Sequence, residues 1–356
     1  MREHFPVRGL STMVLAAAAI LAFLCGSKAR AQVVLQSDTA LHQTLQGLAE
    51  KHHGKVALYA VQLNTGKMVA LDADKLVQTA SVIKLAILFE AMEQIKAGKA
   101  RWEEKLALAK GDGVSGSGVL NLLDAPMELT LKDVLTLMIV MSDNTATNLA
   151  IDRLGLDAIN ARIAWLGLKQ THLYKKIGKP ATGPMPGDQS KFGLGKTTPR
   201  EIALVMERIG RCQLEGPYVE VTGAKAAEVE IRDLGICAVG MKMLRNQFYR
   251  ETIPRYLEKL DASEAGSGIA SKTGSLNAVR ADVAMVAGKS GPMVLSIFTY
   301  ENEDTSWTVD NAGEILIARL AREIVEAWSP AGLDGKMLVP GLGLSPVGVS
   351  PPGASK

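Results

Sequence analysis

The chain has 356 residues, of which 47% are hydrophobic and 22% are charged. This is an ordinary globular composition, and the length allows one large domain or two moderate ones. The first 31 residues hold four of the 40 basic residues and one of the 37 acidic residues, so the remaining chain is close to neutral. A nucleic-acid partner, which would need a basic face, is therefore not expected.

The N-terminal segment, residues 1–31, is typical of a secretory signal peptide. A positively charged start precedes an apolar run over residues 13–25, which is too short for a comfortable membrane span. The Ala-Arg-Ala sequence at its end is a small-x-small cleavage site. We expect cleavage after Ala31 and a periplasmic or secreted protein without a stable membrane span. An uncleaved N-terminal anchor is the alternative.

Two cysteines, Cys212 and Cys237, would remain after the signal peptide had been removed together with Cys25. An even pair of cysteines in an oxidising compartment permits a disulfide. Two buried thiols are an equal alternative on the sequence alone.

Helical and strand patterns alternate in the first hundred residues. Leucines at helical spacing predict a helix over residues 39–53. Residues 56–63 and 67–71 form two strand-like runs, and the Asn-Thr-Gly sequence between them predicts a hairpin turn. A helix then starts near Ser81 and is apolar nearly all round, which is typical of a helix buried at the centre of a domain.

The middle of the chain is mostly helical in pattern, and strand patterns return near its end. The clearest helices are predicted at residues 131–141, 199–210 and 311–327. A long loop rich in Gly, Pro and Lys covers residues 178–196. Three strands are predicted at residues 268–275, 280–287 and 292–300. The tail, residues 329–356, is dense in Pro and Gly and is expected to be disordered.

The predicted strands lie at both ends of the chain, so they must pair in one sheet to bury their faces. We therefore expect an α+β fold with a five-stranded antiparallel sheet flanked by helices, and a mostly helical second lobe. The domain would span residues 32–328. Its α/β lobe would comprise about 38–80 and 265–328, and its helical lobe about 81–264. A cleft between two such lobes is a common place for an active site.

A serine and a lysine, Ser81 and Lys84, lie one turn apart at the predicted start of the buried helix. Positions i and i+3 share a helix face, so the amine can reach the hydroxyl. Burial and a second cation would lower the pKa of Lys84 and let it act as a neutral base for a nucleophile that is weak on its own. An N-capping serine followed by a solvent-directed lysine is the structural alternative.

A second motif, Ser142-Asp143-Asn144, follows the apolar helix predicted at residues 131–141. Ser142 could relay a proton to a leaving group, and Asn144 could bind both Lys84 and the substrate. The alternative is a plain helix end, because Ser, Asp and Asn are common capping and turn residues.

A third motif, Lys272-Thr273-Gly274, lies on the predicted strand over residues 268–275. Lys272 projects a charge, Thr273 points the other way, and Gly274 lets a ligand backbone approach closely. An ordinary strand end would leave a lysine inside an apolar run unexplained.

Together these motifs resemble those of the class A β-lactamases and related penicillin-recognising serine enzymes, in which S-x-x-K, S-D-N and K-T-G occur in this order. The similarity includes residues 141–149, 197–199 and 271–276 and covers about residues 38–328. It implies a monomer without cofactor or metal, acylated at Ser81 by a β-lactam or an acyl-D-alanyl amide.

The resemblance also implies the roles of individual residues. The catalytic residues would be Ser81, Lys84, Ser142 and Lys272. Backbone N–H groups of Ser81 and Ser275 would form the oxyanion hole. The substrate-binding residues would be Asn144, Thr273, Gly274 and Ser275. Arg280 would help to bind the substrate carboxylate, or it is an ordinary surface arginine on a strand.

One departure concerns the second half of the reaction. Class A enzymes use a glutamate in the loop before the T-T-P sequence to activate the deacylating water. This chain has no glutamate between Ile159 and Arg200, and its only acid there is Asp188. Asp188 either activates the water or is a solvated loop residue.

Three functions remain open at this point. The first is a β-lactamase that hydrolyses its acyl-enzyme and could confer antibiotic resistance. The second is a D-alanyl peptidase or esterase, in effect a penicillin-binding protein with slow deacylation. The third is a non-catalytic module that senses β-lactams or peptidoglycan. A metalloenzyme is not expected, because none of the five histidines has zinc-ligand spacing.

Overall fold

The computed structural model describes residues 33–214, 224–261 and 268–338, and of residues 224–232 it describes the backbone alone. The predicted signal peptide lies outside these ranges. None of the helices in the described parts combines the length and the apolar character that a membrane crossing requires.

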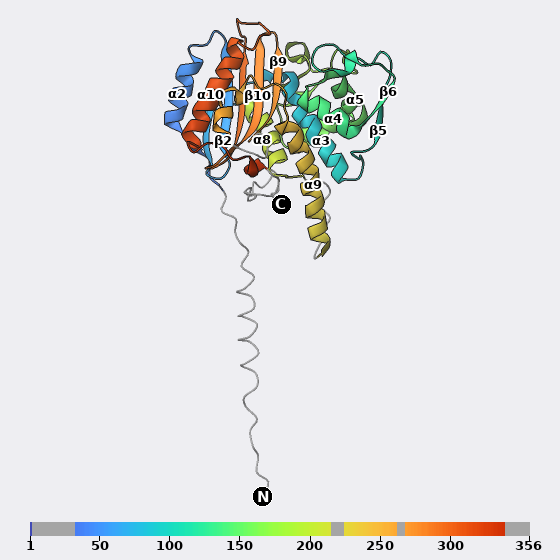
Figure 1. Cartoon of the computed structure of the whole chain (residues 1–356), viewed down its shortest axis with the longest axis horizontal. Coiled ribbons are helices and arrows are strands. Elements are labelled where there is room, and N and C mark those ends of the chain that lie inside the picture. Colours follow the sequence, from blue (N-terminus) through green and yellow to red (C-terminus); the bar gives the residue numbers. More distant parts are fainter. Residues whose placement is uncertain (2–32, 215–223, 262–267, 339–356) are drawn as a thin grey trace.

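A six-stranded sheet forms the framework of the molecule (Figure 1). Its strands, in spatial order, are β1 (Gln36–Ser37), β3 (Lys67–Leu71), β2 (Lys55–Gln62), β11 (Gly291–Tyr300), β10 (Val279–Gly288) and β9 (Ile269–Leu276). Every neighbouring pair is antiparallel except β1 and β3, which are parallel. The prediction of a five-stranded antiparallel sheet was therefore wrong. The extra strand is two exposed residues long, so it carries no hydrophobic alternation that a sequence pattern could reveal.

Helices cover both faces of the sheet, and Figure 1 shows α2 (Thr39–Ala49) and α10 (Ala312–Trp328) together on one of them. The side chains of successive β10 residues point to opposite faces of the sheet, as expected for a strand. Ala284 and Val286 pack with α2 and α10, whereas Val283 and Met285 belong to the larger core under the helical lobe. The sheet therefore lies between two hydrophobic cores and contributes side chains to both.

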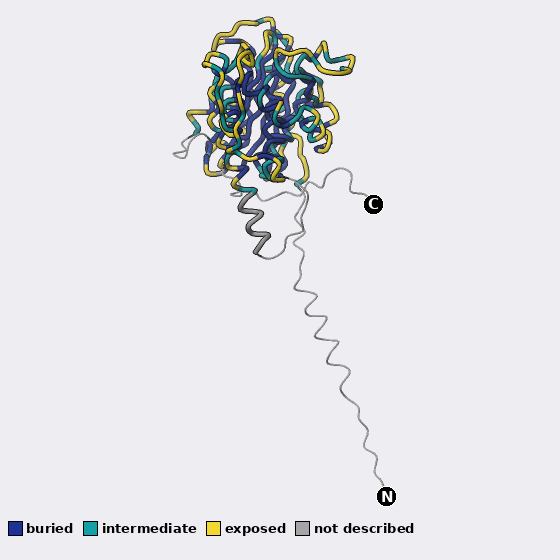
Figure 2. Tube along the Cα trace, turned by 90° about the vertical axis from the view of Figure 1, so that its right-hand side faces the viewer, coloured by how far each residue is buried: buried dark blue, intermediate teal, exposed yellow. Residues whose placement is uncertain are grey.

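The helical lobe is built around α3 (Lys84–Lys96). Its ten residues Lys84–Glu93 are all buried, which confirms the central position predicted from its apolar circumference. Figure 2 shows the same buried centre, with exposed residues confined to the outside. The other helices are α4 (Leu131–Val140), α5 (Asn144–Leu154), α6 (Leu156–Trp165), α7 (Gln189–Phe192), α8 (Pro199–Gly210) and α9 (Ala224–Arg245).

Short strands and 3₁₀ turns complete the described elements. Two small antiparallel sheets consist of β5 (Lys105–Leu108) with β6 (Met127–Thr130), and of β4 (Val77–Gln78), β8 (Gly195–Thr197) and β7 (His172–Leu173). The 3₁₀ turns are η1 (Ala80–Ile83), η2 (Leu120–Leu122), η3 (Ile253–Tyr256), η4 (Glu258–Leu260) and η5 (Gly335–Leu338). The residues of α8 fall within the range predicted for the helical lobe. In the structure, however, this helix packs on the sheet strands β2, β10 and β11.

The prediction of a disordered tail is wrong for its first ten residues. Residues 329–338 are packed against the body: the Ser329 hydroxyl donates to the Gly332 carbonyl at 2.9 Å, and the side chains of Leu333 and Leu338 are buried. These two leucines lie in a Pro- and Gly-rich segment without hydrophobic periodicity, so the sequence pattern did not reveal that they are buried. The rest of the predicted disordered tail, residues 339–356, lies outside the described residues.

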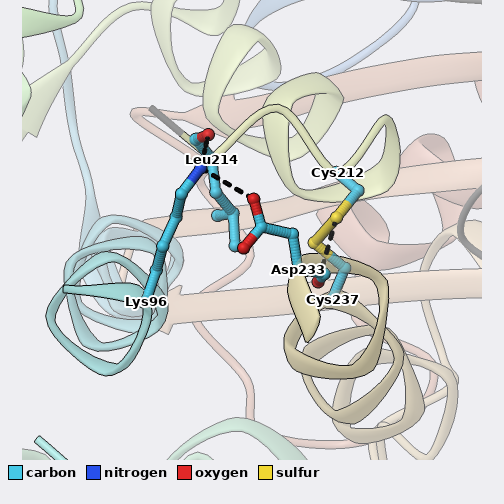
Figure 3. The surroundings of a disulfide bond; sticks show 5 residues. All are labelled: Lys96, Cys212, Leu214, Asp233 and Cys237. Atoms are coloured by element: carbon cyan, nitrogen blue, oxygen red, sulfur yellow. Dashed lines mark hydrogen bonds and ion pairs between the residues drawn. A yellow bond between two sulfur atoms is a disulfide. The ribbon is translucent and has the colours of Figure 1, made fainter. Parts of the chain in front are cut away.

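A disulfide joins the end of α8 to α9, with the Cα atoms of Cys212 and Cys237 5.5 Å apart (Figure 3). The two cysteines therefore form a disulfide and are not two buried free thiols. Beside it, the Lys96 ammonium pairs with the Asp233 carboxylate at 2.7 Å and donates to the Leu214 carbonyl. The disulfide and this ion pair hold the three helices α3, α8 and α9 together.

Replacing both cysteines by serine is expected to lower the free energy of unfolding by about 3.5 kcal/mol, because the bond closes a loop of 25 residues in the unfolded chain. Urea unfolding of the two proteins measures the difference. Wild-type protein treated with dithiothreitol should show the same loss, and equal midpoints for all three samples would contradict the prediction.

Candidate active site

The three sequence motifs meet where the edge strand β9 passes the turn η1 and the α4–α5 connection. Gly274 shows how close β9 and η1 lie: a Cβ atom built on it would be 2.9 Å from the backbone nitrogen of Ser81 and 3.0 Å from that of Val82. Only a residue without a side chain permits this approach. The third motif therefore lies directly against the first.

Ser81 lies on a 3₁₀ turn and not on the α-helix itself, which begins at Lys84. The preceding Ala80 has a φ of 44°, a conformation that L-residues seldom adopt. Thr79 holds the turn: its N–H and its hydroxyl both donate to the Gly195 carbonyl, at 3.0 and 3.2 Å. Ser81 is thus half-buried and lies just before the N-terminus of the buried helix α3.

Lys84 is completely buried and is held by the second motif. Its ammonium nitrogen donates to the Ser142 carbonyl at 2.6 Å, to the Ser142 hydroxyl at 3.1 Å and to Asn144 Oδ1 at 3.2 Å. Burial, followed by the positive charge of Lys272, holds the pKa of Lys84 well below its usual value of 10.5, while the charge of Asp143 opposes this shift. The lowered pKa favours the neutral form of this amine, which lies one turn along the chain from Ser81.

The second motif forms the corner between α4 and α5. Ser142 is buried and has a φ of 51°, which turns the chain sharply. Asp143 caps α5 by accepting from the Ala146 N–H at 2.9 Å, so the capping interpretation is right for this residue. Asn144 additionally donates from its amide to the Ser115 carbonyl at 3.0 Å. The same corner therefore ends one helix, starts the next and binds Lys84.

Lys272 and Thr273 alternate along β9, as expected for a strand. Lys272 is fully buried, and its ammonium donates to the Thr273 carbonyl at 2.8 Å. Burial lowers the pKa of Lys272 to about 7, although the charge of Asp282 acts in the opposite direction. The charge of Lys272 in turn contributes to the lowered pKa of Lys84.

Arg280 is engaged inside the protein. It lies opposite Ser275 in the β9–β10 ladder, yet its side chain is fully buried. It forms an ion pair with Glu314 at 3.0 Å and lies over the Trp307 ring at 4.9 Å. Its other donors bind backbone carbonyl groups, those of Leu276, Asn277, Val279 and Ser306. Arg280 is therefore not a surface residue. Its part in binding the substrate carboxylate stays a prediction.

Asp188 is bound by two neighbours in the loop between β7 and β8. Its carboxylate accepts from the Tyr174 hydroxyl at 2.8 Å and from the Lys196 ammonium at 2.6 Å. These hydrogen bonds, that of Lys196 first, lower the pKa of Asp188. A carboxylate whose basicity is reduced in this way is a poor activator of water.

Two asparagines that the sequence did not single out hold the backbone of this loop. Asn148 accepts from the Ile177 N–H and donates to the Ile177 carbonyl, at 2.8 and 2.9 Å. Asn160 makes the same pair of contacts with Leu173, at 3.0 and 2.8 Å. A lone asparagine within a helix carries no signal for such a contact, so the sequence alone could not have found them.

The residue types of the three motifs are those that acyl transfer requires. Among the described residues, no group of three or more His, Cys, Asp and Glu side chains is placed to hold a metal ion. The three motifs supply two hydroxyls, those of Ser81 and Ser142, and two amines of lowered pKa, those of Lys84 and Lys272. Groups of these kinds suit nucleophilic attack and proton transfer.

Comparisons with known proteins agree with this geometry. Residues 40–328 match the model of the beta-lactamase enzyme family. The solved β-lactamase of Sphaerobacter thermophilus DSM 20745 is 30% identical, with a TM-score of 0.66 over 82% of this chain and 97% of that one.

Two further solved structures show the fold alone. A point mutant of PBP-A, solved as an acyl-enzyme complex with penicillin G, is 24% identical with a TM-score of 0.65 over 83% of this chain and 98% of that one. An ancestral class A β-lactamase (GNCA) is 20% identical with a TM-score of 0.64 over 81% and 99%. The chain thus belongs to the beta-lactamase enzyme family and is a serine β-lactamase-like hydrolase.

Proposed function

We propose that β-lactam-type amides acylate Ser81 and that the protein is a β-lactamase that then hydrolyses the adduct. The observation that carries this proposal is the buried Lys84 amine, which is bound to Ser142 and Asn144 and lies one turn from Ser81. The S. thermophilus protein described as a β-lactamase supports the choice of substrate class.

We infer the acylation step from the chemistry of these groups and from the family resemblance. Neutral Lys84 takes the proton of the Ser81 hydroxyl, and the freed oxygen forms a bond to the carbonyl carbon of the amide. Backbone N–H groups of Ser81 and Ser275 stabilise the resulting oxyanion. The C–N bond then breaks, and Ser142 passes the proton held by Lys84 to the leaving nitrogen. Lys272, Thr273 and Ser275 bind the substrate carboxylate.

Deacylation is the step in which this chain departs from the class A pattern. The loop that precedes α8 has no glutamate, and the pKa of Asp188 is lowered by Lys196 and Tyr174. These observations favour a second candidate function, a penicillin-binding peptidase or esterase whose acyl-enzyme turns over slowly. A non-catalytic sensing module remains the third possibility.

The deciding experiment is labelling with a fluorescent penicillin, followed by mass spectrometry of the peptide that contains Ser81. We expect an adduct on Ser81 and none on the Ser81→Ala variant, and an unlabelled wild type would reject the enzyme proposals in favour of the sensing module. Hydrolysis of a chromogenic cephalosporin then separates the first two candidates. Steady turnover identifies a β-lactamase, whereas a burst of one equivalent identifies a slowly deacylating penicillin-binding protein.

We also propose that the protein is exported and acts as a monomer in the periplasm or outside the cell. The pattern of residues 1–31 supports export, and so does the disulfide, because such bonds persist in oxidising compartments. N-terminal sequencing of the mature protein should begin at Gln32.

A further inference from the structure

A buried arginine holds the turn that joins β9 to β10. This turn directly follows Ser275, and Leu276 and Val279 pair with each other where the two strands meet it. Arg280 is the ladder partner of Ser275, so the two side chains lie on the same face of the sheet. The Arg280 guanidinium donates to the carbonyl groups of Leu276 and of Val279. It therefore binds both ends of the turn after Ser275.

The same guanidinium is also bound to α10 and to the segment before it. The Arg280 Nε donates to Glu314 Oε1 at 3.0 Å, and Nη2 donates to the Ser306 carbonyl. The Ser306 carbonyl accepts in addition from the Asn311 amide at 3.0 Å, and Asn311 caps α10 by accepting from the Glu314 N–H at 3.3 Å. The turn is thus tethered through Arg280 to a helix that packs on the sheet.

The Arg280 side chain is closed off from solvent. It is 0% exposed, and the ring of Trp307 lies over its guanidinium at 4.9 Å. A buried guanidinium needs acceptors for its five N–H groups, and here they are one carboxylate and several backbone carbonyls. A substrate carboxylate would have to displace the ring and some of these acceptors. The geometry therefore favours a task in holding the backbone over direct contact with a substrate.

We propose that Arg280 is a positioning residue that fixes the backbone N–H of Ser275, one of the two donors of the proposed oxyanion hole, by tethering the turn that follows it. This inference rests on the proposed function, because it takes the role of that N–H group from the acylation step. Such donors lower the barrier only when they are held where the oxyanion forms. The tether requires the planar fork of an arginine, which a lysine cannot reproduce.

The test compares the acylation rates of penicillin and of its uncharged methyl ester in Arg280→Lys, which keeps the positive charge but removes the fork. We expect both rates to fall by the same factor of about 10², because a displaced N–H group affects any carbonyl that reacts. The control is Arg322→Lys, the same change at an exposed arginine of α10 that pairs with Glu326, and it should leave both rates unchanged. A loss confined to penicillin would overturn the proposal in favour of direct carboxylate binding, and so would unchanged rates.

Infrared spectroscopy of the acyl-enzyme distinguishes a displaced N–H group from a general loss of stability. The stretching frequency of a ¹³C-labelled ester carbonyl falls when N–H groups donate to its oxygen. We expect this band at a higher wavenumber in Arg280→Lys than in wild type, whereas Arg322→Lys should match wild type. An unchanged band in Arg280→Lys would show that Arg280 contributes to stability alone and would refute the positioning role.

Hydrogen exchange tests the tether without any substrate. In Arg280→Lys, backbone N–H groups of residues 274–280 should exchange faster by up to about tenfold, the effect of losing one hydrogen bond on local opening. The turn between β2 and β3, residues 63–66, should exchange as in wild type. Unaltered exchange at residues 274–280 would overturn the tether, whereas failure of penicillin to label the wild type would count against the proposed function instead.

A double variant covers the case in which Arg280→Lys does not fold. Arg280→Met combined with Glu314→Gln removes the fork and its carboxylate together, so no buried charge is left without its partner. The same loss of rate with both compounds and the same faster exchange are expected. A loss with penicillin alone, or normal exchange in the turn, would again contradict the proposal.

Discussion

Replacing Lys84 by alanine is expected to slow the acylation of Ser81 by a factor of about 10² to 10⁴, the usual contribution of a general base. The amine is completely buried next to Ser142 and Asn144, so no solvent group can take its place at that position. The measurement is the second-order rate of labelling by a fluorescent penicillin, with thermal unfolding as a check on folding.

A matched control exists on the same helix. Lys96→Ala removes the lysine at the other end of α3, which pairs with Asp233 away from the motifs, and should leave the labelling rate unchanged. If the Lys84 variant were labelled as fast as wild type, Lys84 would not be the base.

The acylation rate is expected to depend on pH through both Lys84 and Lys272, which act in opposite directions. The pKa of Lys84 is depressed, so the neutral base forms as the pH rises through that depressed value and the rate increases. Lys272 is protonated below its pKa of about 7, so the attraction of an anionic substrate weakens as the pH rises through that value.

Adding one methyl group at Gly274 is expected to reduce the acylation rate by about 10²-fold or more. The new Cβ would lie 2.9 Å from the Ser81 nitrogen, which is a backbone atom that cannot rotate away. The turn η1 would have to move, and a misplacement of about 1 Å at a reacting group costs this much in rate. Gly274→Ala should therefore be folded but poorly labelled.

Gly47→Ala is the control for this change. Gly47 lies on α2, and a Cβ atom there would meet no other atom within 4 Å. It should keep full labelling and gain stability of up to about 1 kcal/mol from the higher helix propensity of alanine. Normal labelling of Gly274→Ala would show that the close packing of β9 on η1 is not needed for catalysis.

Much of the framework could be predicted because its signals are local. The strands β9, β10 and β11 follow from their β-like sequence runs, the helix α8 from its helical periodicity, and α3 from its apolar circumference. The closeness of Ser81 and Lys84 follows from their spacing within one turn. Ser142 and Lys272 could be added only through the family resemblance, because nothing local indicates which distant residues meet.

The features that the sequence could not supply depend on tertiary contacts. The strand β1 and the anchors at Leu333 and Leu338 lack any periodicity. The sequence permitted the bond between Cys212 and Cys237 but did not decide it, because the distance between two cysteines is a property of the fold. Arg280 resembles a surface strand residue until Glu314 and Trp307 are placed beside it.

The pairing of β2 with β11 determines when the enzyme can become active. In this ladder Lys55 lies opposite Tyr300, so β2 can pair with β3 early but with its second neighbour, β11, only after almost the whole domain has been synthesised. Contacts between such distant parts of a chain form slowly. A polypeptide that stops before β9 would contain Ser81 and Lys84 but not the strand against which the nucleophile turn packs. Catalytic competence thus arises late, with the last strands, and truncated products should be inert.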